Sequence, residues 1–207
     1  MKKILYGILI ALFVISCETR SYSPEYSNTL RNYPNDFIKH FPYKISNGIL
    51  HETTNPQLDV IRLFLIINDS TQKFKILKDS LDKISIAKYS AQDSCLLIVN
   101  KFTTEQNFSI EKKANEKVIQ QYLKKRCLRN KMPIPNFWGL YEENLHTLPQ
   151  LPKDFDIYIL EAKKGLFWDE KHRSSGEYMP DYWKHGYSRG IAMNDKTHEI
   201  IYWFVLW

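Results

Sequence analysis

Residues 186–190 read Gly-Tyr-Ser-Arg-Gly, a G-x-S-x-G spacing that can present a serine hydroxyl as a nucleophile. Asp195 and His198 follow Ser188 in the chain, in an order that could supply a base and a group to orient it. Such a nucleophile needs a strand before it and a helix after it. Here the motif leads instead into a turn and then into the strand-like run 200–206. The surroundings therefore predict an ordinary β-strand, and a small serine hydrolase using Ser188 and His198 remains an alternative function.

The six histidines are scattered, and none forms the i, i+4 pair that a helical metal site uses. Residues 51–55 (His-Glu-Thr-Thr-Asn) begin like a zinc-protease helix, but Asn55 stands where the second histidine is required. Asp169, Glu170 and His172 could offer ligands, although an exposed charged loop explains them equally well. We therefore expect neither a metal site nor a cofactor site.

Two of the three cysteines, Cys95 and Cys127, lie within the folded part of the chain. A disulfide between them is allowed in an oxidising compartment. The alternative is a pair of buried, apolar thiols, one on a strand and one on a helix. The spacing alone does not decide between these two states.

Aromatic residues gather at the end of the chain, where four of the five tryptophans occur. Exposed rings of this kind stack on sugars or on partner proteins, so Trp168, Tyr182 and Trp183 are candidates for a binding surface. The alternative is an aromatic-rich core. The last strand is apolar on both faces, so one face can fill the core while the other needs a second layer or a ligand.

Two periodicities of apolar residues predict the elements around these positions. The run 60–68 has the length and branching of a buried strand. Apolar steps of three and four predict an amphipathic helix over residues 70–83, with Asp69 and Gln72 at a capping-box spacing. Further strands are predicted over residues 84–89, 95–100 and 155–163, and a C-terminal hairpin over 187–193 and 198–206.

Basic residues are concentrated in a second amphipathic helix, predicted over residues 111–129. The whole chain has a net charge of +6, and residues 111–131 hold eight basic residues against Glu111 and Glu116. Because the excess of basic residues is confined to this one segment, it does not fit a nucleic-acid-binding protein. A solvated helix face explains it, and contact with anionic lipid head groups is the alternative.

The order of elements predicts a single α+β domain with a mainly antiparallel sheet, two amphipathic helices and a C-terminal β-hairpin. Residues 25–58 are poorly periodic apart from a helical turn or two near residues 36–41. Residues 132–153 contain four prolines and form a long connection or a boundary between two halves.

The N-terminus has a pattern of its own. Lys2 and Lys3 precede a twelve-residue apolar run at residues 4–15. As a helix this run would extend about 18 Å, too short for a hydrocarbon core of about 30 Å. The run ends in Val-Ile-Ser-Cys at residues 14–17 and resembles the lipobox of bacterial lipoproteins.

That resemblance implies a signal peptide over residues 1–16, removed after a diacylglyceryl group is attached to the thiol of Cys17. N-acylation, with a chain such as palmitate, often follows. Two or three acyl chains anchor a protein stably. Residues 17–24 would be the lipidated tether, and residues 25–207 the globular domain. Glu18 is not the Asp associated with retention in the inner membrane of enteric bacteria, so an outer-membrane location is favoured.

These observations predict a lipid-anchored lipoprotein of the bacterial cell envelope whose domain binds a protein or a glycan without catalysis. Its membrane contact is through Cys17. The first alternative is the serine hydrolase described above. The second is an envelope lipoprotein that confers immunity by inhibiting a toxin.

Overall fold

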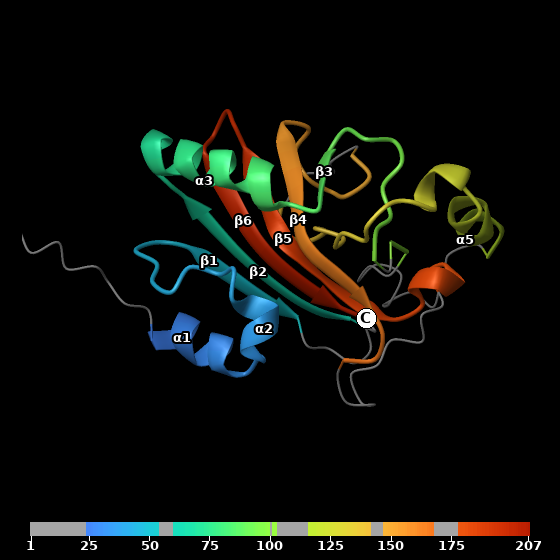
Figure 1. The fold of residues 1–207 in the computed structure, drawn as a ribbon, viewed down its shortest axis with the longest axis horizontal. Coiled ribbons are helices and arrows are strands. Elements are labelled where there is room, and N and C mark those ends of the chain that lie inside the picture. Colours follow the sequence, from blue (N-terminus) through green and yellow to red (C-terminus); the bar gives the residue numbers. More distant parts are fainter. Residues whose placement is uncertain (1–23, 54–59, 100, 103–115, 142–146, 168–177) are drawn as a thin grey trace, which may run out of the picture.

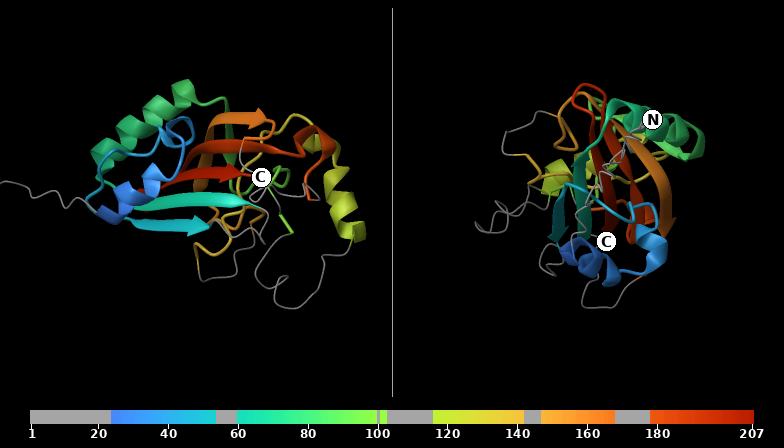
Figure 2. Two further views of the ribbon diagram at one scale, coloured as in Figure 1. Left: turned by 90° about the horizontal axis from the view of Figure 1, so that it is seen from below. Right: turned by 90° about the vertical axis from the view of Figure 1, so that its left-hand side faces the viewer.

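The computed structural model describes residues 24–53, 60–99, 101–102, 116–141, 147–167 and 178–207. Its centre is a six-stranded, fully antiparallel sheet (Figures 1 and 2). Across the sheet the strands are β1 (Ile49–Thr53), β2 (Ile61–Asn68), β6 (Glu199–Leu206), β5 (Gly186–Asn194), β4 (Phe155–Lys164) and β3 (Ala87–Ser90). This confirms the predicted α+β class, and the C-terminal hairpin β5–β6 lies at the centre of the sheet.

The described α-helices are α1 (Pro24–Arg31), α2 (Asn35–Ile38), α3 (Thr71–Ile84) and α5 (Glu116–Leu123), with short 3-10 helices η2 (Arg126–Leu128) and η4 (Asp181–Trp183). Three of these four α-helices cover one face of this sheet, and the fourth, α5, contributes Tyr122 to the core on the opposite face. Helix α3 confirms the prediction from apolar spacing. Its N-cap is Ser70, without a side-chain cap, so the capping box expected from Asp69 and Gln72 is not formed.

Several other predictions differ from the structure. Residues 95–99 form no strand and make only an isolated parallel bridge, Ile98 to Ile134. The basic helix is shorter than predicted: α5 ends at Leu123 and η2 follows, while residues 111–115 lie outside the described part. Strand β1 and helix α1 were not predicted, because neither has a clear apolar period.

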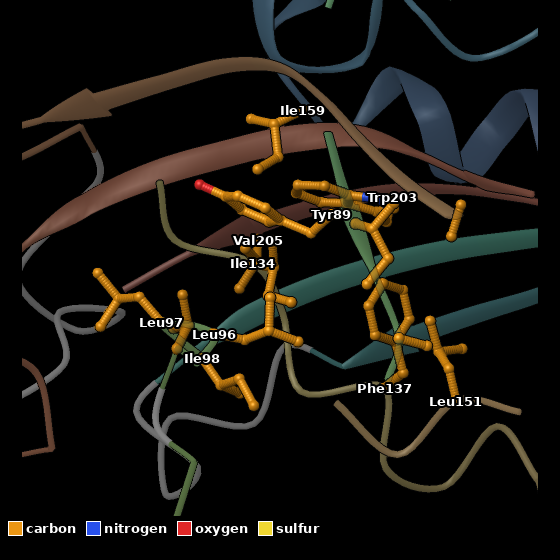
Figure 3. Packing of buried hydrophobic residues seen from close by; sticks show 14 of the residues in the cluster. Tyr89, Leu96, Leu97, Ile98, Ile134, Phe137, Leu151, Ile159, Trp203 and Val205 are labelled. Carbon is orange, nitrogen blue, oxygen red and sulfur yellow. The ribbon is translucent and has the colours of Figure 1, made fainter. Parts of the chain in front are cut away.

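Two apolar cores, one on each face of the sheet, explain the aromatic C-terminus. Tyr202, Phe204 and Leu206 of β6 pack beneath α1, α2 and α3. Trp203 and Val205 point to the opposite face, where residues 96–99, 132–137 and 151 cover them (Figure 3). The second layer needed by the doubly apolar strand is therefore supplied by irregular chain on one side and by helices on the other.

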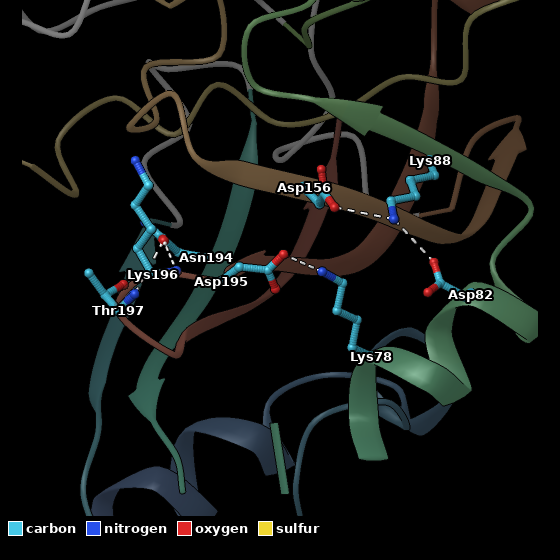
Figure 4. A network of polar contacts seen from close by, with 8 residues as sticks. All are labelled: Lys78, Asp82, Lys88, Asp156, Asn194, Asp195, Lys196 and Thr197. Atoms are coloured by element: carbon cyan, nitrogen blue, oxygen red, sulfur yellow. Dashed lines mark hydrogen bonds and ion pairs between the residues drawn. The ribbon is translucent and has the colours of Figure 1, made fainter. Parts of the chain in front are cut away.

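Polar contacts tie α3 to the sheet and shape the β5–β6 turn (Figure 4). The Asn194 side-chain oxygen accepts hydrogen bonds from the backbone N–H groups of Lys196 and Thr197. Lys78 of α3 pairs with Asp195 in this turn. Lys88 of β3 contacts both Asp82 of α3, at 3.1 Å, and Asp156 of β4, at 3.2 Å. These ion pairs are partly exposed, so their contribution lies mainly in fixing the position of α3.

Candidate binding pocket

The G-x-S-x-G motif lies inside strand β5, and its serine is enclosed. Ser188 has no exposed surface, and its hydroxyl donates a hydrogen bond of 2.7 Å to the carbonyl of Pro133. No helix follows the motif, because β5 continues to Asn194. Ser188 therefore joins the sheet to the covering segment around Pro133, and no solvent path reaches its hydroxyl.

The register of the hairpin also separates Ser188 from His198. Ser188 pairs with Val205, whereas Asn194 pairs with Glu199 beside the turn. Six residues along an antiparallel strand correspond to about 20 Å. His198 packs against the ring of Phe74, with the ring centroids 5.1 Å apart. The structure thus does not bring the proposed nucleophile and base together.

A buried polar cluster surrounds Arg189, the residue that follows Ser188 in the motif, on the opposite face of β5. A β-bulge between Ile159 and Glu161 shifts the alternation of β4, so that Glu161 reaches Arg189. The Nε of Arg189 donates to the Glu161 carboxylate at 2.8 Å, and the Lys163 ammonium lies 2.7 Å from its other oxygen. Arg189 is 7% exposed, so its charge is neutralised by a partner within the protein.

His40 completes this cluster from the segment after α2. Its Nε2 lies 2.9 Å from the carbonyl of Trp203. A carbonyl only accepts, so Nε2 carries the proton, and Nδ1 accepts from the Arg189 guanidinium at 3.4 Å. Burial lowers the pKa of His40 to about 3, against the opposing effect of the Trp203 carbonyl. The ring is therefore neutral at neutral pH. Because its members satisfy one another, we interpret this cluster as structural.

Among the described residues no group of three or more His, Cys, Asp or Glu side chains is placed to hold a metal ion. Cys95 and Cys127 form a disulfide, with Cα atoms 6.2 Å apart. The bond lies near the surface, since Cys127 of η2 is exposed and Cys95 is half-buried. This decides between the two states that the sequence left open.

The three aromatic candidates have different positions. Trp168 lies outside the described residues. Trp183 is only 6% exposed and packs against Trp207, whose indole N–H donates 2.8 Å to the Trp183 carbonyl. Trp183 therefore belongs to the core and not to an exposed surface. Tyr182, the residue before it, lines a cavity.

This cavity, called the basic pocket below, has a volume of about 620 Å³ and lies between α5 and η4. Its lining residues are Gln120, Leu123, Lys124, Lys125, Arg129, Met179, Pro180, Asp181, Tyr182 and Lys184. Pockets that hold small ligands have volumes of about 300–1,000 Å³. The basic pocket falls within this range.

Rigid anchors hold both walls of the basic pocket. On one wall, the buried hydroxyl of Tyr122 donates to the Leu96 carbonyl at 2.7 Å and accepts from the Ile98 N–H at 2.9 Å. The disulfide fixes η2 to the same segment. On the other wall, the buried ring of Trp183 holds η4, so that Tyr182 and Lys184 flank the cavity. The walls are therefore positioned before any ligand binds.

The charge of the pocket is strongly unbalanced. Four cations line it, Lys124, Lys125, Arg129 and Lys184, against the single carboxylate of Asp181. Within the described part of the chain, none of these cations is in an ion pair. Burial and the neighbouring charge of Lys125 lower the pKa of Lys101.

The hydroxyl of Tyr182 adds an unusual feature to this wall. It is buried and has no hydrogen-bond partner among the described residues. Burial raises its pKa, and the charge of Arg129 acts in the opposite direction. An unpaired buried hydroxyl costs about 1–3 kcal/mol, which a ligand acceptor could recover.

The basic pocket lies far from the N-terminal helix. In Figure 1 and in the left view of Figure 2, α5 is at one end of the molecule and α1 at the other. A domain tethered through the chain before α1 could therefore present the pocket away from its anchor.

Sequence reasoning found only half of this site. The basic segment 111–131 indicated Lys124, Lys125 and Arg129, but as a solvated helix face. Lys184 and Asp181 carried no signal, because only the folded chain brings η4 beside α5.

No helix in the described part of the chain is both long and apolar enough to cross a membrane. The sequence matches no protein-family model, and comparisons with curated proteins and with solved structures also found no match. The functional argument therefore rests on the residues themselves.

Proposed function

We propose that this chain is a lipid-anchored lipoprotein of the bacterial cell envelope whose domain binds a protein or a glycan through the basic pocket. The observation that carries the proposal is the pocket itself: four cations, none in an ion pair with a described residue, and one carboxylate line the cavity. Several cations that have no carboxylate partner within the described part of the chain, gathered in a concave site, are suited to an anionic ligand.

The proposed anchor is the acylated thiol of Cys17, which lies outside the described residues. The disulfide between Cys95 and Cys127 supports a location outside the cytoplasm, because such bonds persist in oxidising compartments. Glu18 after the acylated cysteine favours the outer membrane. The lipid would hold the domain at the membrane, and the pocket at the far end would meet a partner.

Binding is preferred to hydrolysis because of the position of Ser188. Its hydroxyl is enclosed and already donates to Pro133, and His198 lies at the other end of the hairpin. A serine nucleophile needs a base within hydrogen-bond reach and an open approach for its substrate. Among the described residues, the Ser188 hydroxyl contacts the backbone carbonyls of Pro133 at 2.7 Å and Glu161 at 3.4 Å and not a base, which supports binding over hydrolysis.

Photo-crosslinking in intact cells tests the binding function. A photoreactive residue replaces Gln120 in the basic pocket, or Lys75 on the exposed face of α3 as the matched control. We expect a discrete adduct from position 120 that position 75 does not give. Identical adducts from both positions, or none from position 120, would contradict the proposal.

A further inference from the structure

We propose that the ligand of the basic pocket is an anionic sugar, a saccharide bearing a phosphate or a carboxylate group. This inference rests on the proposed function and specifies its ligand. Two sets of pocket residues carry it, one suited to the anionic group and the other to sugar hydroxyls.

The first set provides the charge. Arg129 offers a planar fork of N–H donors that matches a phosphate or carboxylate, and Lys124, Lys125 and Lys184 add point charges. Lys164 lies 5.8 Å from the centroid of the Tyr182 ring and adds further positive potential. An anion entering the pocket would find these charges free of carboxylate partners among the described residues.

The second set distinguishes a sugar from an acidic peptide. Asp181 can only accept hydrogen bonds when ionised, and the Gln120 amide both accepts and donates. Sugar hydroxyls can donate to these oxygens. The side-chain carboxylates of an acidic peptide have no proton to donate and would be repelled by Asp181, so such a peptide could offer donors only from its backbone N–H groups. A carboxylate within a cationic pocket therefore favours a ligand that carries several hydroxyl groups beside its anionic group.

The shape of the site agrees with this assignment. The cavity of about 620 Å³ is concave and can enclose one or two sugar rings, whereas protein partners are generally bound over broader surfaces. Tyr182 lines the same cavity, and its buried hydroxyl has no hydrogen-bond partner within the described part of the chain.

Calorimetric titration of the mature, lipidated protein in detergent tests this inference. The probes are glucose 1-phosphate, glucuronate, glucose, inorganic phosphate and a tetraglutamate peptide; the first two separate the phosphate and carboxylate forms of the ligand. We expect at least one of them to bind more tightly than inorganic phosphate, glucose and the peptide. The double variant K124E/K125E should lose at least tenfold in affinity, whereas K75E/K83E on α3 should keep it.

The variant Asp181→Ala separates hydroxyl recognition from general anion binding. Removing this carboxylate reduces repulsion for every anion equally, so the informative quantity is the preference for the sugar phosphate over inorganic phosphate. If glucose 1-phosphate is the form that binds, we expect this preference to fall about tenfold, as for one lost hydrogen bond to a charged group. If glucuronate is the form that binds, the preference of the pocket for glucuronate over acetate should fall likewise.

Three results would overturn the inference. The first is equal affinity for sugar-linked and free anions in the wild type, the second is tighter binding of the tetraglutamate peptide, and the third is failure of all probes to bind. In each case the crosslinking from position 120 still decides the broader proposal, so the two can fail separately.

Discussion

At the scale of single residues, Ser188 is the position where a chemical motif has become a structural contact. Its hydroxyl is buried and bonded to the Pro133 carbonyl at 2.7 Å. Ser188→Ala should therefore lower the free energy of unfolding by about 1–3 kcal/mol, because the carbonyl would lose its buried donor. Sequence reasoning alone predicts only a small change. Denaturant unfolding measures the difference, with the exposed Ser80→Ala of α3 as control.

A fluorophosphonate probe provides the chemical counterpart of this stability measurement. We expect no labelling of the wild type, since the probe cannot reach an enclosed hydroxyl. Specific labelling that disappears in Ser188→Ala would instead favour the hydrolase alternative.

The buried His40 makes stability depend on pH. Burial, the largest cause, lowers its folded-state pKa to about 3, whereas the unfolded value is near 6.5. Below pH 6.5 the His40 ring becomes protonated in the unfolded chain but stays neutral in the folded chain. The free energy of unfolding therefore falls as the pH decreases toward 3. His40→Gln should flatten this dependence between pH 6.5 and 4.5 in urea unfolding. An unchanged slope would show that His40 is not responsible.

Glu161 makes stability depend on pH in a lower range than His40 does. Its burial alone would raise the pKa, but hydrogen bonds from Lys163 and Arg189 outweigh burial and lower it to about 2. A carboxylate with a lowered folded-state pKa contributes stability that is present above pH 4.5 and is lost as the pH falls through 2. Glu161→Gln should remove this loss in acid unfolding curves, whereas Asp79→Asn, which changes an exposed carboxylate of α3, serves as the control.

At the scale of elements, the disulfide holds the wall of the basic pocket. It joins two positions separated by 32 residues, so its loss should lower stability by about 3–4 kcal/mol on the chain-entropy model. We predict that C95A/C127A unfolds at a lower denaturant concentration than the wild type. Reductant should lower the unfolding midpoint of the wild type toward that of the variant and leave the variant unchanged. Two free thiols in the purified protein, detected by alkylation, would contradict the bond.

The elements that sequence reasoning found are those with a clear period and a large buried face. Strand β2, helix α3 and the hairpin β5–β6 all belong to this group. Residues 95–99 were predicted as a strand because a fully buried coil and a buried strand have the same apolar composition. Strand β1 was missed because it is a half-exposed edge strand without clear alternation. The bulge that brings Glu161 to Arg189 also left no local signal.

At the scale of the whole molecule, the candidate site is a product of tertiary folding. Residues 120–129 and 179–184 are separated in the chain by the whole of strand β4. Local patterns indicated that one segment was basic and that the other was aromatic. Only packing of Tyr122 and Trp183 into one core places them face to face.

The proposed lipid anchor is tested on the whole chain. Labelling of cells with a clickable fatty acid should mark the wild type, because acylation is proposed at the Cys17 thiol. Cys17→Ala should lose the label and accumulate as a precursor of higher mass. Equal labelling of both proteins would disprove anchoring at this residue.

The most direct test of the central claim is the yield of the crosslinked adduct from position 120 when the charge of the pocket is reversed. We predict that K124E/K125E loses the adduct and that K75E/K83E, with the same change in net charge on α3, retains it. An adduct that persists undiminished in K124E/K125E would show that the partner does not depend on the basic pocket, and would contradict the account.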